Sequence, residues 1–239
     1  MNLRTAAAAV VVAVAVPLCW TGCGQAEKPY QAKPAYSGKR PSLPAVPTLP
    51  DKAKKEGDAF TVYGATHDLR SRVHADDFRD KQTTIQGYIV KTNYADAPPC
   101  SIHKTGKGDP PDCKAPVPTF WIADDLGEKD EIIQVMGFAS NYAQLYTIMQ
   151  AIDEAAKGEE DKVKLNDEFW GMELPNPVPE VGAKVKLTGA YGVTFTKATK
   201  GAAANPKHGI MTVEKIEYVE KPKQRASLPG MKIKKPTIE

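Results

Sequence analysis

The sequence predicts a mainly β domain with one helix, flanked by an N-terminal and a C-terminal tail that are both disordered. Five segments are rich in β-branched and aromatic residues, which favour strands. One longer segment carries apolar residues at helical spacing. We therefore expect one folded domain over residues 57–220, which is long enough to bury a substantial core. Residues 221–239, with six basic residues and one acidic residue, are expected to form a basic tail.

Three strands are expected before the helix. Residues 82–94 read QTTIQGYIVKTNY, in which Gly87 predicts a bulge or bend. Residues 117–124 (VPTFWIAD) and 131–138 (EIIQVMGF) follow, and the turn-like DLGE between them predicts a hairpin. A further short strand is expected over residues 60–64.

The helix is expected over residues 140–157, where Ser140 or Asn141 is a suitable N-cap. After an irregular stretch rich in proline, residues 183–196 and 210–219 alternate between apolar and polar side chains. This period of two predicts two more strands. The helix thus separates the third strand of the main set from the fourth.

This order of elements, with a glycine in the first strand, resembles the OB-fold, a five-stranded Greek-key barrel. The resemblance covers residues 82–219 and rests on the phrases GYIV (87–90), TFWIAD (119–124), IIQVMGF (132–138), PEVGAKVKLTGAYG (179–192) and MTVEKIEYV (211–219). It implies that a ligand, commonly an oligonucleotide or oligosaccharide, binds across the second and third strands and the adjoining loops. The candidate ligand face then carries four aromatic residues, Tyr88, Tyr94, Phe120 and Trp121.

Successive side chains of a strand point to opposite faces. One of the neighbours Phe120 and Trp121 is therefore expected in the core, while the other points outward.

The charge of the predicted domain argues against a nucleic-acid partner. Residues 57–220 hold 18 basic and 25 acidic residues. The predicted hairpin alone carries Asp124, Asp125, Glu128, Asp130 and Glu131 against Lys129. Single-stranded nucleic acid requires a positive groove lined by stacking aromatic side chains. Nucleic-acid binding is therefore the least favoured alternative.

The first residues predict an export signal. Arg4 precedes an apolar run over residues 6–18, which is too short to cross roughly 30 Å of hydrocarbon. The small residues and Cys23 that follow resemble the lipobox of bacterial lipoproteins, with Trp20 where that pattern usually has leucine. The resemblance implies that residues 1–22 are a signal peptide and that Cys23 carries acyl chains, such as palmitate, that anchor the protein to a membrane. An ordinary cleaved signal peptide is the alternative.

Gly24 stands where many lipoproteins of the inner membrane have aspartate. The resemblance therefore implies the cell envelope, with the outer membrane favoured over the inner one and the domain facing the periplasm or the cell surface. Residues 23–56 hold six prolines and no apolar periodicity, so they are expected to form an extended tether.

The segment between the first two strands of the main set holds Cys100, His103 and Cys113. In an oxidising compartment, two cysteines with twelve residues between them are expected to form a disulfide that closes the loop. A soft-metal site at the same three residues is the alternative, in an envelope protein that handles metal or is an enzyme. Because no C-x-x-C pair is present, the disulfide is favoured and no metal or cofactor is expected.

No catalytic motif is evident in the sequence. The histidines His67, His74, His103 and His208 lie in polar segments, outside any recognisable nucleophile, zinc-hydrolase or phosphate-loop motif. The sequence therefore predicts a non-catalytic binding or assembly module of the cell envelope. Its expected partner is an envelope protein or a glycan.

Overall fold

The computed structural model describes residues 29–31, 38, 44–45, 52–104, 108–195 and 204–238. The chain divides into two units, Met1–Thr48 and Leu49–Glu239, and every element below belongs to the second unit. The predicted signal peptide and Cys23 lie outside the described residues, as does most of the predicted tether. Among the described residues, no helix has both the length and the apolar character needed to cross a membrane.

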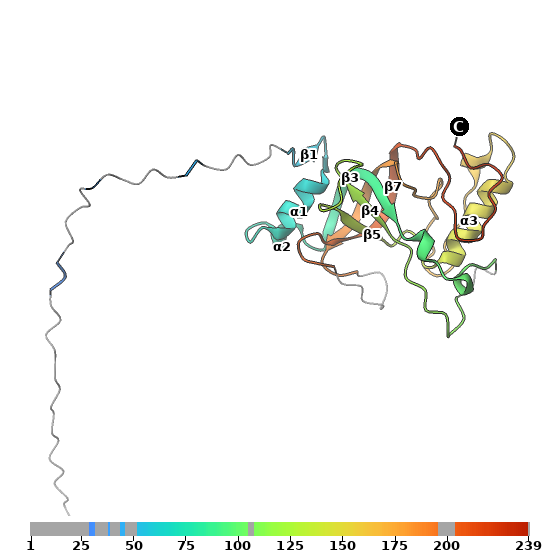
Figure 1. Cartoon of the computed structure of the whole chain (residues 1–239), viewed down its shortest axis with the longest axis horizontal. Helices are drawn as coiled ribbons and strands as arrows, with labels where there is room; N and C mark the ends of the chain where they lie inside the picture. Colours follow the sequence, from blue (N-terminus) through green and yellow to red (C-terminus); the bar gives the residue numbers. More distant parts are fainter. Residues whose placement is uncertain are drawn as a thin grey trace, which may run out of the picture. The chain divides into compact units, whose positions relative to one another are not determined.

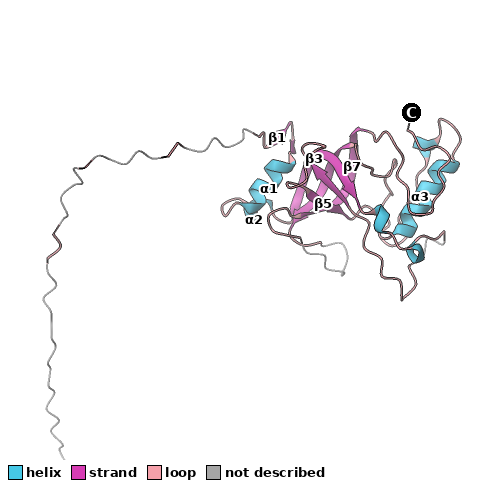
Figure 2. Ribbon diagram, viewed as in Figure 1, coloured by secondary structure: helices cyan, strands magenta, loops and turns pink. Residues whose placement is uncertain are grey.

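Seven strands form one mixed sheet, and five of them close into a ring (Figures 1 and 2). The strands are β1 (Lys55–Glu56), β2 (Ala59–Phe60), β3 (Lys81–Thr92), β4 (Phe120–Ala123), β5 (Ile133–Met136), β6 (Lys184–Gly192) and β7 (Ile210–Glu220). Their order is β1-β2-β3-β4-β5-β7-β6, and a second pairing of β3 with β6 closes the ring. The predicted hairpin of β4 and β5 is antiparallel and is confirmed, whereas β5 and β7 run parallel.

Strand β3 closes the ring because it pairs with β6 along residues 81–88 and then with β4. The change of partner occurs at Tyr88, which pairs with Lys184 of β6 and with Ala123 of β4. At the preceding residue, Gly87, a Cβ atom would lie 2.8 Å from the carbonyl oxygen of Ala123. Only glycine permits so close an approach of the β4 backbone. The register shift against β4 falls at Val90, so the bulge follows the glycine rather than coinciding with it.

The interior of the ring is filled by alternate residues of its strands. In β6, Val185 and Leu187 are fully buried while the lysines beside them are partly exposed, as the alternating pattern predicts. The largest of the buried strand side chains are Ile85, Ile89, Phe120, Ile122, Ile133, Leu187 and Tyr191. The predicted strand segments therefore supply most of the main core.

Helices α1 (Val62–Arg70) and α2 (Ala75–Phe78) lie on one side of the strands, and α3 (Tyr142–Glu154) lies on the other (Figure 1). The expected strand over residues 60–64 is wrong beyond Phe60, because the chain turns into α1 there. The hydroxyl of Thr61 accepts the N–H of Gly64 at 3.0 Å and caps the helix. Three short one-turn 3-10 helices, η1 (Tyr94–Asp96), η2 (Pro99–Ser101) and η3 (Glu160–Lys162), complete the elements.

Helix α3 confirms the prediction made from the apolar spacing of its sequence. Asn141 is its N-cap, and the side-chain oxygen of Asn141 accepts the N–H of Gln144 at 3.0 Å. Leu145 and Ile148 are fully buried in the main core cluster. The helix therefore covers one opening of the strand ring.

Two acidic side chains of the β4–β5 hairpin hold α1 in place. The carboxylate of Asp124 accepts the N–H of Val62 at 2.6 Å and the N–H of Tyr63 at 2.8 Å. These are orphan donors of the first helical turn, and an anion at a helix N-terminus is favourable. Burial nevertheless raises the pKa of Asp124. On the same side, Glu131 accepts hydrogen bonds from the hydroxyl of Thr66 and the guanidinium of Arg70.

The C-terminal segment, residues 221–238, is folded, so the prediction of a disordered tail is wrong. Ala226 and Leu228 are 4% and 3% exposed and belong to the main core cluster. Isolated apolar residues among lysines and prolines form no periodic pattern, and the surface that buries them lies far away in the sequence. The sequence therefore gave no local signal of their burial.

Acidic residues near the end of α3 fix this C-terminal segment. The buried carboxylate of Asp153 accepts the backbone N–H groups of Lys234 and Lys235 at 2.9 to 3.0 Å. The Nζ atom of Lys235 donates to Glu160 at 3.0 Å and to the carbonyl of Ala155 at 2.7 Å. The segment thus lies beside α3 in Figure 1.

Replacing Asp124 by alanine is expected to lower the free energy of unfolding by about 1 to 3 kcal/mol, because two N–H groups of α1 lose their acceptor. Chemical denaturation measures the change. Asp125→Ala is the matched control, since Asp125 is exposed and adjacent and should change stability by less than about 0.5 kcal/mol. Equal losses in the two variants would contradict this role of Asp124.

The anchoring of the C-terminal segment is expected to weaken in acid. Hydrogen bonds from its own backbone N–H and from Lys235 lower the pKa of Glu160 from 4.5 to about 2, against the raising effect of burial. A depressed pKa in the folded state stabilises the fold above pH 4.5, and this stabilisation is lost as the pH falls from 4.5 towards 2.

Melting temperatures recorded across this pH range test the assignment. Glu160→Gln should lose less stability on acidification than the wild-type chain. Glu159→Gln, which removes an exposed neighbouring carboxylate, should follow the wild type. Identical pH profiles for the wild type and Glu160→Gln would refute the role of Glu160.

Candidate binding surface

Two of the four aromatic residues predicted to form the ligand face lie on the outer side of the ring. Trp121 is partly exposed, whereas its neighbours Phe120 and Ile122 are fully buried. Tyr88 is partly exposed in the same way on β3. Because strand side chains alternate, Phe120 is the core member of its pair and Trp121 is the outward one.

Tyr94 and Phe120 do not belong to a ligand face, so this part of the prediction is wrong. Phe120 is 0% exposed and packs against Phe138, with 5.1 Å between ring centroids. Tyr94 is 2% exposed, and its hydroxyl donates to the carbonyl of Pro179 at 2.8 Å. Burial raises the pKa of Tyr94 well above its usual value. Both rings are buried in the interior, because elements that are distant in the sequence pack over them.

Cations lie over the two outward aromatic rings. Lys91 Nζ is 4.8 Å from the ring centroid of Trp121, and Lys184 Nζ is 5.2 Å from that of Tyr88. Such contacts contribute roughly 0.5 to 1 kcal/mol at exposed sites. Trp121 also lies opposite Gln134 in the β4–β5 pairing. The outer side of β3, β4 and β5 is therefore aromatic and edged by positive charge.

A second apolar cluster continues this outer side onto β5 and β7. Met136, Phe195 and Ile210 are 3%, 2% and 1% exposed and form a cluster separate from the main core. Trp170 packs against it, with its ring centroid 6.4 Å from that of Phe195. Met136 adjoins the Trp121 region through Gln134, whose amide donates to the Met136 sulfur at 3.4 Å.

We call Tyr88, Trp121, Met136, Trp170 and Phe195 the outer apolar face. Sequence reasoning missed three of these residues. Trp170 stands in an irregular segment without periodicity, whereas Met136 and Phe195 read like any apolar residue of a predicted strand. For Trp170, the only signal of such a role was an aromatic residue that stands alone in a polar, irregular segment.

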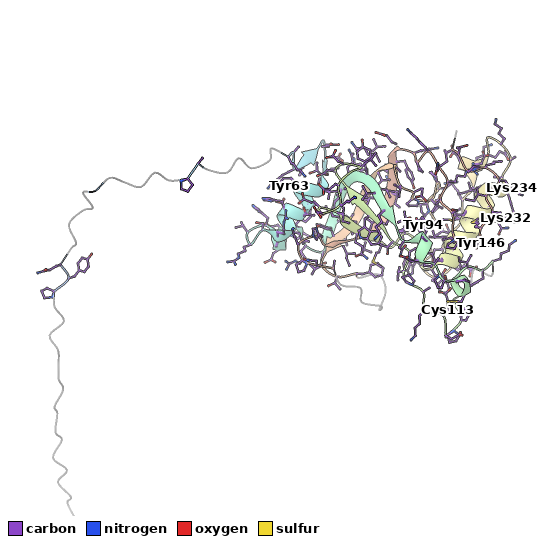
Figure 3. All side chains as sticks on the ribbon, in the orientation of Figure 1. Tyr63, Tyr94, Cys113, Tyr146, Lys232 and Lys234 are labelled. Carbon is purple, nitrogen blue, oxygen red and sulfur yellow. A yellow bond between two sulfur atoms is a disulfide. The ribbon has the colours of Figure 1, made fainter. Side chains whose placement is uncertain are left out.

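The loop between β3 and β4 is closed by a disulfide. The sulfur atoms of Cys100 and Cys113 are 2.06 Å apart, and Cys113 lies at the periphery of the domain in Figure 3. His103 Nε2 lies 3.4 Å from Asp109 Oδ1 within the loop. The side chain of Asn93 joins the two ends of the loop. Its amide group donates to the carbonyl of Val117, and its amide oxygen accepts the N–H of Thr119.

The alternative metal site at Cys100, His103 and Cys113 has no thiolate to offer while the disulfide is formed. Within the described parts of the chain, no group of three or more His, Cys, Asp or Glu side chains is arranged to hold a metal ion. The loop geometry therefore favours a structural role for these cysteines.

Comparison with known proteins assigns no family. No family model matches the chain, and no curated protein matches it either. Among solved structures, the chain is similar to a protein of Leishmania major Friedlin described as an aspartyl-tRNA synthetase, with 13% identity and a TM-score of 0.31. The match covers 74% of this chain but only 24% of that chain, so this chain spans about a quarter of that protein's length. A similarity this weak assigns neither a fold nor a function.

The disulfide is expected to stabilise the domain by about 3 kcal/mol, since it closes a loop of 13 residues' separation. The double variant Cys100→Ser/Cys113→Ser should lose that amount in chemical denaturation. Denaturation of the wild-type chain in the presence of a reductant is the control and should give the same loss. A loss below about 0.5 kcal/mol in both experiments would show that the loop is held by its other contacts.

Proposed function

We propose that the chain is a membrane-anchored lipoprotein of the cell envelope whose domain is a non-catalytic binding or assembly module. The observation that carries this proposal is the outer apolar face, which combines the partly exposed rings of Tyr88, Trp121 and Trp170 with the buried side chains of Met136 and Phe195. Partly exposed aromatic rings on a folded domain are typical of interaction sites.

The proposal assigns the ring of five strands to an OB-like Greek-key barrel. Two observations support this assignment: β3 pairs with both β4 and β6, and α3 connects β5 to β6, the third and fourth strands of the ring. In an OB-fold, ligands bind across the second and third strands. The corresponding strands are β4 and β5, which carry Trp121 and Met136 of the outer apolar face.

The chemistry of this face favours a protein partner. Aromatic residues and methionine are enriched at the centres of protein interfaces, where apolar side chains fill complementary pockets. Lys91 flanks the face and suits a polar rim that meets acidic groups of a partner, whereas Lys184 already pairs with Glu56 at 3.2 Å. A glycan, which would stack on the ring of Trp121, is the competing outcome of the test below.

The envelope location rests on the sequence of the N-terminal region. The apolar run, the lipobox-like Cys23 and the proline-rich segment after it support an acylated chain that holds the domain away from its membrane. A disulfide between Cys100 and Cys113 agrees with an oxidising compartment.

Photo-crosslinking in native envelopes tests the proposal. A photoreactive residue replacing Trp121 is expected to give a defined adduct in the membrane fraction, because a bound partner would cover this position. The same residue at Val73, which is 76% exposed between α1 and α2, is the matched control and should give no adduct.

The partner identified by mass spectrometry is then purified and its affinity measured. Trp121→Ala should weaken binding at least tenfold, and Val73→Ala should leave it within twofold. Saturable glycan binding that is lost in Trp121→Ala would replace the protein partner by a glycan. The absence of both an adduct at position 121 and glycan binding would overturn the binding-module proposal.

A further inference from the structure

A cavity of about 510 Å³ lies between the end of α3, the 3-10 helix η3 and the folded C-terminal segment. Its volume falls within the range of small-ligand sites. Its walls include both charged and apolar side chains, and it shares none of them with the outer apolar face. The cavity is therefore a second place on the domain where a ligand can be accommodated.

Positive charge exceeds negative charge in the lining of this cavity. Its cationic side chains are Lys157, Arg225, Lys234 and Lys235, and its acidic ones are Glu160 and Asp161. Asp161 is bound through both carboxylate oxygens, at 3.0 Å, by Lys221 from outside the lining. The lining thus has an excess of two positive charges even before Lys221 is considered.

Arg225 combines a largely enclosed side chain with long contacts to its neighbours. Its side chain is only 13% exposed. One terminal nitrogen lies 3.4 Å from the carbonyl oxygen of Ile152, and the other lies 3.7 Å from Glu160, beyond hydrogen-bonding distance. A guanidinium has five N–H donors arranged as a fork. A largely buried cation with such long contacts suits an additional anionic partner.

Glu160 pairs with Arg225 only at a long distance, because its carboxylate lies closer to Lys235. The distance from Lys235 Nζ to Glu160 Oε1 is 3.0 Å, against 3.7 Å from Arg225 to the same oxygen. The fork of Arg225 therefore keeps N–H donors available to an oxyanion, which it can bind through two parallel hydrogen bonds.

Apolar side chains complete the cavity. Ile152, Pro177, Pro236 and Ile238 line it together with the charged groups. A ligand that suits both kinds of wall has an anionic head and an apolar body. Phosphate fits the head, since its double negative charge matches the excess of two positive charges and its oxygens accept a bidentate arginine.

We propose that this cavity binds a phosphate group attached to an apolar body, with Arg225 as the bidentate donor and Lys234 as the second cation. The phosphate belongs either to the headgroup of a membrane lipid or to a soluble phosphate ester. The recognition chemistry is the same in both cases, and the experiment separates the two sources.

Isothermal titration of the full chain, in a non-ionic detergent and a chloride buffer, tests the proposal with inorganic phosphate and hexyl phosphate as probes. Hexyl phosphate should bind saturably and more tightly than inorganic phosphate, because it also contacts the apolar wall. Arg225→Lys, which keeps the charge but removes the fork, should weaken binding at least tenfold. Lys234→Ala should weaken it at least threefold.

Lys232→Ala is the matched control, because Lys232 is an exposed lysine two residues from Lys234 that does not line the cavity (Figure 3). It should bind hexyl phosphate within twofold of the wild type. Equal weakening by Lys232→Ala and Lys234→Ala would show attraction to general surface charge and overturn the site. The absence of saturable binding of both probes would overturn it as well.

Co-sedimentation with vesicles identifies the source of the phosphate. The full chain with Cys23→Ser is used, because it has no acyl chain that could insert into the vesicles by itself. Its binding to phosphatidylcholine vesicles that contain phosphatidic acid, whose phosphate is a monoester, but not to pure phosphatidylcholine, and the loss of this binding in Arg225→Lys would assign a lipid headgroup. Binding of hexyl phosphate without such vesicle binding would assign a soluble phosphate ester. Either result supports the cavity as a phosphate site.

Discussion

The fold depends on the pairing of one strand, β3, with two neighbouring strands. β3 pairs with β6 and then with β4, and without this double pairing the sheet would stay open at both edges. Two glycines make the close backbone contacts possible: a Cβ at Gly87 would lie 2.8 Å from a carbonyl oxygen of β4, and one at Gly189 would collide with the backbone of β7. Ring closure in turn creates an inner face that is mainly apolar and an outer face that is partly exposed.

A ring of strands has two openings, and polar chemistry determines what covers each of them. Asp124 holds the N-terminus of α1 on one side, and Asp153 holds the turn of the C-terminal segment against α3 on the other. Both carboxylates accept backbone N–H groups that are far away in sequence. Two of the five acidic residues of the hairpin, Asp124 and Glu131, are therefore used to bind α1.

Irregular segments supply residues both to the outer apolar face and to the cavity beside α3. Two tyrosines hold the long stretch between α3 and β6 in place: the hydroxyl of the buried Tyr94 in η1 donates to Pro179, and that of the partly buried Tyr218 in β7 donates to Pro177. This stretch supplies Trp170 to the outer apolar face and one wall of the phosphate-sized cavity. A rigid ring with anchored loops is a common basis for binding sites, because the loops are positioned without being part of the sheet.

The sequence by itself determined the identity of the main strands and of α3, and narrowed the N-cap of α3 to Ser140 or Asn141, because period and capping chemistry act over a few neighbouring residues. It could not separate Tyr94 from Tyr88, since two aromatic residues of one predicted strand look alike until the elements that cover them are placed. It also missed α1, a nine-residue helix with Gly64 inside it, and the burial of Leu228. The tertiary structure decided these points, because whether an isolated side chain is buried depends on surfaces that the chain brings together only when the ring closes.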